Sequence, residues 1–173
     1  MRLTSGKLVL VLLFGISLIT GRTYSQSITI PPRIQAALFL KIFKYESALR
    51  DKGAIKVLIV FDEVVESEKN ELVRSMENAS FIVNAVKPGE LEENIADFDA
   101  AYFMQGLHEY GQVCKKYNVL SISTFPKNVE EGYISLAIGI YDAKPRIYVN
   151  LASLKREGSN ISAELLRFAQ VFE

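Results

Sequence analysis

The chain has 173 residues, with 20 basic and 20 acidic side chains, one histidine and one cysteine, so its formal net charge is zero. This balance offers no basic surface for nucleic acid, and a single cysteine excludes an internal disulfide bond. The length is sufficient for one domain with one hydrophobic core.

The N-terminus has the pattern of a secretory signal peptide. Arg2 and Lys7 precede an uninterrupted apolar run over Leu8–Ile19, and small residues lead to a cut after Ser25. The run is shorter than the roughly 20 residues that a membrane-spanning helix needs. We therefore expect residues 1–25 to be removed during export. The alternative is an uncleaved segment that anchors the domain in the membrane.

Cleavage leaves residues 26–173 as the mature domain. Arg2, Lys7 and Arg22 leave with the signal, so 17 basic side chains face 20 acidic ones and the net charge becomes −3. A small negative charge favours solubility and predicts no nucleic-acid partner.

Helical and strand patterns alternate through the first two thirds of the mature chain. Pro31 and Pro32 begin an amphipathic helix that we expect to end at Gly53. Strands separated by helices predict a parallel α/β sheet with helices on both faces. The predicted strands are Ile55–Phe61, Ser80–Val86, Ala100–Met104 and Val119–Thr124, and the predicted helices between them are Glu66–Met76, Leu91–Ile95 and His108–Tyr117.

The last third predicts an antiparallel β-hairpin followed by two helices. The second helix has a capping residue in Asn160 or Ser162. The fold class is therefore α/β: a single domain with a mostly parallel, Rossmann-like sheet, helices on both faces and a C-terminal antiparallel hairpin. The segments are Tyr133–Ile140 and Pro145–Asn150 for the hairpin strands, Tyr141–Lys144 for the turn, and Leu151–Arg156 and Ile161–Phe172 for the helices.

Acidic residues and one histidine are the candidates for chemistry. Asp62 and Glu63 follow the first predicted strand, where α/β proteins place ligands. Glu66 and Glu68 come soon after, so the cluster also fits an acidic first turn of the next helix, and we favour that interpretation. His108 has no second histidine to complete a metal site or a catalytic pair. We predict no catalytic residue, no metal and no cofactor.

The single cysteine and the aromatic residues predict packing. Cys114 lies in a predicted helix, where a free cysteine usually behaves as a small hydrophobic residue. A reactive or bridging thiol is the less favoured alternative. Five aromatic residues fall at helical spacing that is typical of a core, although some of them can remain exposed as an interface patch: Phe39, Phe43, Tyr45, Phe168 and Phe172.

Several segments carry a recognisable family pattern. They are Val119–Ser123, Gly132, Arg146–Asn150, Ile161–Leu166 with Ala169 and, in the first helix, Ala36–Phe39 and Phe43–Tyr45. With these segments the chain resembles the YfiR family of exported bacterial regulators. It departs from that family in having no Trp-Pro pair after the first helix and no means of forming the disulfides of the best-known members.

The resemblance implies a small periplasmic protein that binds the sensor domain of a membrane diguanylate cyclase and holds the enzyme inactive. A histidine kinase is the other membrane partner we consider, and a homodimer stays open. The resemblance also implies structural roles at four positions: Gly132 for backbone freedom, Asn150 for a turn or cap, and Leu165 and Leu166 for the core.

Two other functions remain open alongside this non-enzymatic regulator. The first is a periplasmic solute-binding module that uses the strand ends near Asp62, Met104 and Thr124. The second is a hydrolase with Asp62 or His108 as its base. The sequence assigns no binding residue to a partner interface.

Overall fold

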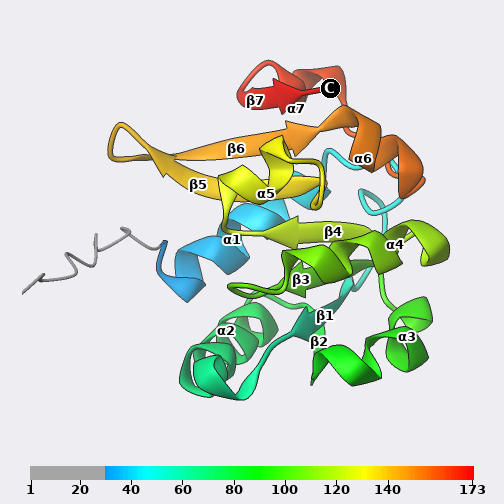
Figure 1. Cartoon of the computed structure of the whole chain (residues 1–173). Helices are drawn as coiled ribbons and strands as arrows, with labels where there is room; N and C mark the ends of the chain where they lie inside the picture. The colour runs from blue at the N-terminus through cyan, green and yellow to red at the C-terminus, as the bar shows by residue number, and fades with distance from the viewer. Residues whose placement is uncertain (1–29) are drawn as a thin grey trace, which may run out of the picture.

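Seven strands form one sheet in the order β2-β1-β3-β4-β5-β6-β7 (Figure 1). The computed structural model describes residues 30–173, so the predicted signal peptide lies outside the described residues. Strands β1 to β5 are parallel, β6 is antiparallel to β5, and β7 runs parallel to β6. The strands are β1 (Lys56–Val60), β2 (Ile82–Val86), β3 (Ala100–Phe103), β4 (Leu120–Ser123), β5 (Leu136–Tyr141), β6 (Lys144–Asn150) and β7 (Ala169–Phe172).

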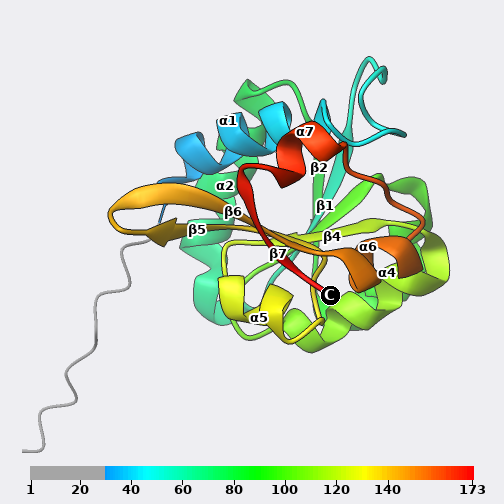
Figure 2. The same ribbon diagram turned by 90° about the horizontal axis from the view of Figure 1, so that it is seen from above.

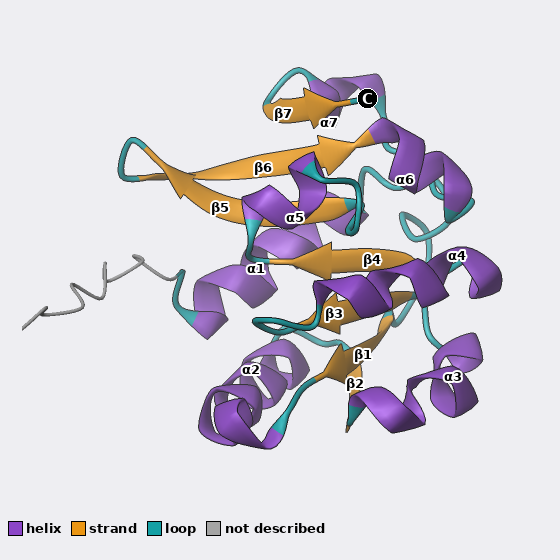
Figure 3. Cartoon of the chain, in the orientation of Figure 1, coloured by secondary structure: helices purple, strands orange, loops and turns teal. Residues whose placement is uncertain are grey.

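Helices cover both faces of the sheet, as the view from above shows (Figure 2), and Figure 3 distinguishes the helices from the strands in the orientation of Figure 1. Helices α1, α2 and α7 pack on one face, and α3, α4 and α5 pack on the other. This arrangement confirms the predicted fold class. Within residues 30–173, no helix has the length and hydropathy to cross a bilayer. The helices are α1 (Pro32–Phe43), α2 (Glu66–Asn78), α3 (Leu91–Asn94), α4 (Gln112–Tyr117), α5 (Pro126–Glu130), α6 (Leu151–Arg156) and α7 (Ala163–Leu166).

Two hydrophobic clusters, one on each face of the sheet, make up the core. On the first face Phe39 and Phe43 of α1 are fully buried with ring centroids 6.0 Å apart. Met76 of α2 belongs to the same cluster. On the second face Cys114 of α4 is fully buried, as predicted. Burial of a side chain such as Phe or Met stabilises the fold by about 1.5–3 kcal/mol.

The predicted hairpin and the helix after it form as expected from their turn and capping residues. Asp142 and Ala143 have φ angles of +48° and +57°, which is the left-handed backbone that a two-residue hairpin turn requires. The side chain of Asn150 accepts a hydrogen bond from the Ser153 amide at 2.8 Å and caps α6. Gly132 has a φ of +76°, a backbone conformation that glycine adopts without strain.

The first helix ends ten residues earlier than predicted, at Phe43 rather than at Gly53. The cause is Glu46, whose side chain is buried and accepts hydrogen bonds from the backbone amides of Ala48 and Leu49 at 2.7 and 2.8 Å. These bonds turn the chain away from the helix axis. Apolar spacing beyond Phe43 therefore does not continue the helix, because a local side-chain acceptor competes with it.

The prediction of one helix over Ile161–Phe172 is wrong. Only α7 is helical, and Ala169–Phe172 forms β7 alongside β6. Without this strand the backbone groups of β6 would lie unpaired at the edge of the sheet, so pairing outweighs the helical periodicity. As a result Phe168, predicted to pack in the core, is 75% exposed.

Candidate functional site

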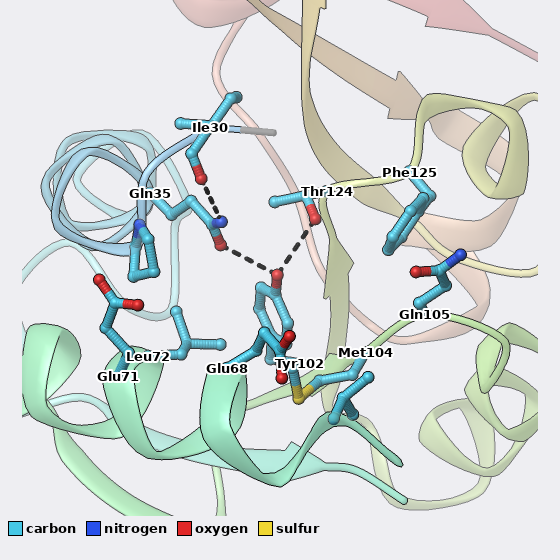
Figure 4. A pocket seen from close by; sticks show the side chains of 12 residues that line it. Ile30, Gln35, Glu68, Glu71, Leu72, Tyr102, Met104, Gln105, Thr124 and Phe125 are labelled. Carbon is cyan, nitrogen blue, oxygen red and sulfur yellow. Dashed lines mark hydrogen bonds between the residues drawn. The ribbon is translucent and has the colours of Figure 1, made fainter. Parts of the chain in front are cut away.

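A cavity of about 420 Å³ opens at the carboxyl ends of β3 and β4, between α1 and α2 (Figure 4). It lies beside the point where the sheet order reverses between β1 and β3, the place where open α/β sheets bind ligands. We call it the strand-end cavity. Its lining residues are Ile30, Pro32, Gln35, Val65, Glu68, Glu71, Leu72, Tyr102, Met104, Gln105, Thr124 and Phe125.

A chain of hydrogen bonds crosses one wall of the cavity. The Gln35 amide nitrogen donates to the carbonyl oxygen of Ile30 at 2.6 Å. The Tyr102 hydroxyl lies 2.9 Å from Gln35 Oε1 and 3.2 Å from Thr124 Oγ1. Gln35 and Tyr102 are buried, so this network also fixes the start of α1 against β3.

The directions of these hydrogen bonds are determined by Ile30. A carbonyl oxygen only accepts, so the Gln35 side chain must present its nitrogen to Ile30 and its oxygen to Tyr102. Tyr102 then uses its only proton on Gln35, and Thr124 donates to Tyr102. The second N–H of Gln35 is therefore the one free donor of this network, and its remaining capacity is in oxygen acceptors.

Burial raises the pKa of the Tyr102 hydroxyl to about 12, while the hydrogen bond with Thr124 lowers it by a smaller amount. The phenol therefore stays protonated at neutral pH. Its role is to hold and orient the wall of the cavity, because a group with this pKa is a poor base under such conditions.

The mouth of the cavity is acidic and its floor is apolar. Glu68 and Glu71 extend from α2 and are exposed. Leu72 and Met104 are buried beneath them. None of the described lining residues is a lysine, arginine or histidine.

Two of the three residues predicted for a solute site line this cavity, and one does not. Met104 and Thr124 lie at the ends of β3 and β4 and contribute to its wall. Asp62 instead accepts a hydrogen bond from the Val64 amide at 3.0 Å and begins the short helical turn Glu63–Val65. The neighbouring Glu63 pairs with Lys87, which lowers the pKa of that carboxyl through a side-chain hydrogen bond and charge.

His108 and Cys114 lie apart from the strand-end cavity. The imidazole of His108 packs edge-on against the ring of Tyr133, with centroids 4.9 Å apart. Burial raises the pKa of the Cys114 thiol well above its usual value, and the charge of Glu157 raises it further. Residues 30–173 contain no group of three His, Cys, Asp or Glu side chains placed to hold a metal ion.

Sequence reasoning missed Gln35 and Tyr102, the two central residues of the polar wall. A signal exists for each. Gln35 interrupts the apolar face of α1 in its first turn, and Tyr102 is the one side chain with a hydroxyl in the strand Ala100–Phe103. A polar group within an otherwise buried segment needs a hydrogen-bond partner. That partner is 67 residues away in the chain, which the sequence alone does not reveal.

A second surface feature lies at the hairpin and the start of β7. Tyr141, Arg146, Ile147 and Phe168 line a shallow depression of about 410 Å³, which we call the hairpin hollow. Phe168 is 75% exposed and Tyr141 is 58% exposed. The Arg146 guanidinium lies 4.3 Å from the centroid of the Tyr141 ring. Exposed aromatic rings with an arginine are typical of protein interfaces.

Fold and cavity together define a single α/β domain of the Rossmann-like class with a ligand-sized space at its strand ends. The chain belongs to the YfiR/HmsC-like family, whose sequence profile matches residues 32–170. The match confirms the resemblance noted in the sequence. A search of curated proteins gives no significant match.

Solved structures with a similar fold include a substrate-binding protein. A conserved domain protein from Vibrio cholerae has a TM-score of 0.64 at 12% identity, covering 83% of this chain and 60% of that one. An ABC domain in complex with L-Trp from Streptococcus pneumonia has a TM-score of 0.60 at 12% identity, covering 82% and 60%. A ligand-free, open substrate-binding protein with adhesive properties from Clostridium difficile has a TM-score of 0.57 at 14% identity, covering 80% and 58%.

These similarities establish the fold and nothing more, because identities of 12–14% do not carry a function. The chain spans about 60% of the length of these structures.

Proposed function

We propose that the protein is an exported, non-enzymatic regulator that binds the periplasmic domain of a membrane signalling protein, a diguanylate cyclase or a histidine kinase. The observation that carries this proposal is the family match over residues 32–170. The signal-peptide pattern in residues 1–25 supports a periplasmic location.

Such a regulator acts by differential binding. A protein that binds the inactive conformation of its partner more tightly than the active one shifts the partner toward inactivity. A shift from about 1% to about 99% inactive requires roughly 10⁴-fold tighter binding to the inactive conformation. Tighter binding to one conformation of the partner needs a complementary surface with exposed contact residues, and it needs no catalytic group.

The hairpin hollow is the surface that suits this role. Phe168 is mostly exposed and projects beside Tyr141 and Arg146, and aromatic and arginine side chains contribute most of the binding energy in protein interfaces. Phe168 lies between α7 and β7. A partner that contacts Phe168 therefore binds beside two regular elements of the fold.

A binding titration tests this proposal. The protein is titrated with the purified periplasmic domains of the membrane diguanylate cyclases and histidine kinases of its own organism. We expect Phe168→Asp to weaken binding by about 2 kcal/mol, or roughly 30-fold. The control is Ile82→Asp, which changes an exposed apolar residue on β2 at the opposite edge of the sheet. Equal affinities for the two variants would exclude the hairpin hollow, and no binding by the unmodified protein would exclude the regulator.

A second candidate function is the binding of a small solute, and the strand-end cavity favours it. Its volume of about 420 Å³ falls within the range of roughly 300–1,000 Å³ of known ligand pockets. A substrate-binding protein shares the fold, and so does an ABC domain whose structure is a complex with L-Trp. A thermal-shift screen of metabolites tests this function, since a ligand that binds only the folded protein raises its melting temperature.

A further inference from the structure

We propose that the strand-end cavity takes an organic cation, namely a protonated amine on an apolar body with no acidic group. This inference rests on the second candidate function and specifies the chemistry of its ligand. It does not depend on the regulator proposal.

Charge at the mouth of the cavity gives the first argument. Glu68 and Glu71 are three residues apart on α2, so both side chains leave the same side of the helix. Neither makes an ion pair with a described residue. With two carboxylates and no cationic side chain among the described lining residues, the cavity attracts a positive ligand and repels a negative one.

The buried polar wall gives the second and independent argument. One of the two Gln35 N–H groups is held by Ile30 and the Tyr102 proton is held by Gln35, so the wall presents mainly oxygen lone pairs beside a single free N–H. Thr124 donates its proton to Tyr102, so the oxygen of this lining residue keeps only acceptor capacity. Tyr102 is 3% exposed and Gln35 is 6% exposed, so the wall is preformed and desolvated. An ammonium group has three donors and no acceptor, which matches this wall.

The apolar floor determines the rest of the ligand. Leu72 is 2% exposed and Met104 is 9% exposed, and both lie between the acidic mouth and the sheet. Phe125 adds an aromatic ring on the side of β4. An apolar body gains by leaving water here, and the flexible methionine side chain adapts to its shape.

The same features exclude acidic ligands. A carboxylate or phosphate group would lie near two glutamates without a cation to balance it, and the polar wall would offer it few donors. An amino acid is a poor match for the same reason, since its carboxylate has no partner among the described lining residues.

Three probes of one size and one apolar body separate these possibilities: phenethylamine, 2-phenylethanol and phenylacetate. The purified protein is titrated with each by calorimetry at low ionic strength, because salt screens charges at a cavity mouth. We expect phenethylamine to bind about tenfold more tightly than 2-phenylethanol, which corresponds to about 1.4 kcal/mol, and phenylacetate to bind most weakly.

The double substitution Glu68→Gln with Glu71→Gln removes the charge and keeps the shape of the mouth. We expect it to abolish the preference for the amine while 2-phenylethanol binds as before. The matched control is Glu66→Gln with Glu77→Gln, which removes the same charge from α2 outside the cavity lining. We expect this control to keep the preference.

Three results would overturn the inference. Phenylacetate binding as tightly as phenethylamine would contradict the amine specificity and leave a solute-binding cavity in place. Loss of the preference in the control variant as well would show that net charge, and not Glu68 and Glu71, attracts the cation. Failure of all three probes also overturns the inference, and the metabolite screen then decides the second candidate function separately.

Discussion

Glu157 is a buried carboxyl group near the amino end of β4, the strand whose carboxyl end borders the strand-end cavity. It follows α6 and is 1% exposed. Its two oxygens accept hydrogen bonds from the Ser121 amide at 2.9 Å and from the Ser121 hydroxyl at 2.6 Å. Burial raises the pKa of Glu157 to about 7, although the bonds from Ser121 oppose the shift.

This shift makes stability depend on pH. The folded pKa lies above the ordinary value of 4.5, so the folded protein holds a proton that the unfolded chain releases. The stabilisation is complete below pH 4.5 and is lost as the pH rises to about 7, a change of about 3 kcal/mol. The free energy of unfolding of the unmodified protein, compared with that of Glu157→Gln by urea titration at several pH values, measures this slope.

We expect the Glu157→Gln variant to lack this slope between pH 4.5 and 7. Glu164→Gln changes an exposed glutamate on α7 and serves as its control. A slope that survives in Glu157→Gln and equals that of the control would assign the pH dependence to other groups.

Glu46 holds together two segments that are far apart in the sequence. Besides Ala48 and Leu49, the backbone amide of Asn160 donates to its carboxylate at 3.0 Å, and Glu46 forms an isolated β-bridge with Ile161. Glu46→Ala leaves three backbone donors without their acceptor. We expect a loss of about 2–4 kcal/mol in the free energy of unfolding, measured with urea.

The control for Glu46 is Glu77→Ala, an exposed position on α2, for which we expect a change of at most about 0.5 kcal/mol. Similar stabilities of the two alanine variants would mean that water replaces Glu46 at all three amides.

At the scale of elements, β7 is the edge strand that pairs with the backbone of β6. It pairs with β6 in the register Ile147↔Ala169 to Asn150↔Phe172. Deletion of residues 169–173 exposes the edge of β6, and we expect a loss of about 3 kcal/mol from the lost backbone hydrogen bonds and apolar contacts. Urea unfolding measures this loss, and light scattering measures the association that an open edge promotes.

Deletion of Glu173 alone is the matched control, because this residue is exposed and follows β7. If the longer deletion unfolds at the same urea concentration as this control, β7 contributes nothing to the fold.

The local hydrophobic pattern predicts most of the strands and helices. The wrong predictions occur where a residue far away in the sequence determines the secondary structure. The strand Ile55–Phe61 and the helix Glu66–Met76 are confirmed as β1 and α2, since their periodicity matches the faces that they bury. The segment Ala169–Phe172 is compatible with either structure by spacing alone. Its pairing with β6 is a contact across the fold, which a local pattern does not contain.

For the strand-end cavity, too, local sequence predicts some of the lining residues, and long-range packing determines the others. The position of Met104 and Thr124 follows from the rule that ligands bind at the carboxyl ends of parallel strands. The order of strands, which places α1 and α2 over those ends, was not predicted in detail. Gln35 therefore stayed unrecognised, because its role depends on how α1 packs against β3.

At the scale of the whole molecule, the protein is one α/β domain with two separate candidate binding sites. The strand-end cavity suits a small ligand, and the hairpin hollow suits a protein. The residues changed in the binding tests, Phe168, Glu68 and Glu71, are exposed, so these substitutions change binding with little change in stability, although the floor of the strand-end cavity belongs to the core. The regulator proposal and the amine inference can therefore be tested one at a time.

The most direct measurement is the activity of the membrane signalling protein, a cyclase or a kinase, in vesicles that display its periplasmic domain. We predict that saturating amounts of this protein lower the activity about tenfold or more, which requires a preference for the inactive conformation of at least about 1.4 kcal/mol. Phe168→Asp should restore the activity at the same concentration. Unchanged activity with the unmodified protein bound to the vesicles would contradict the account.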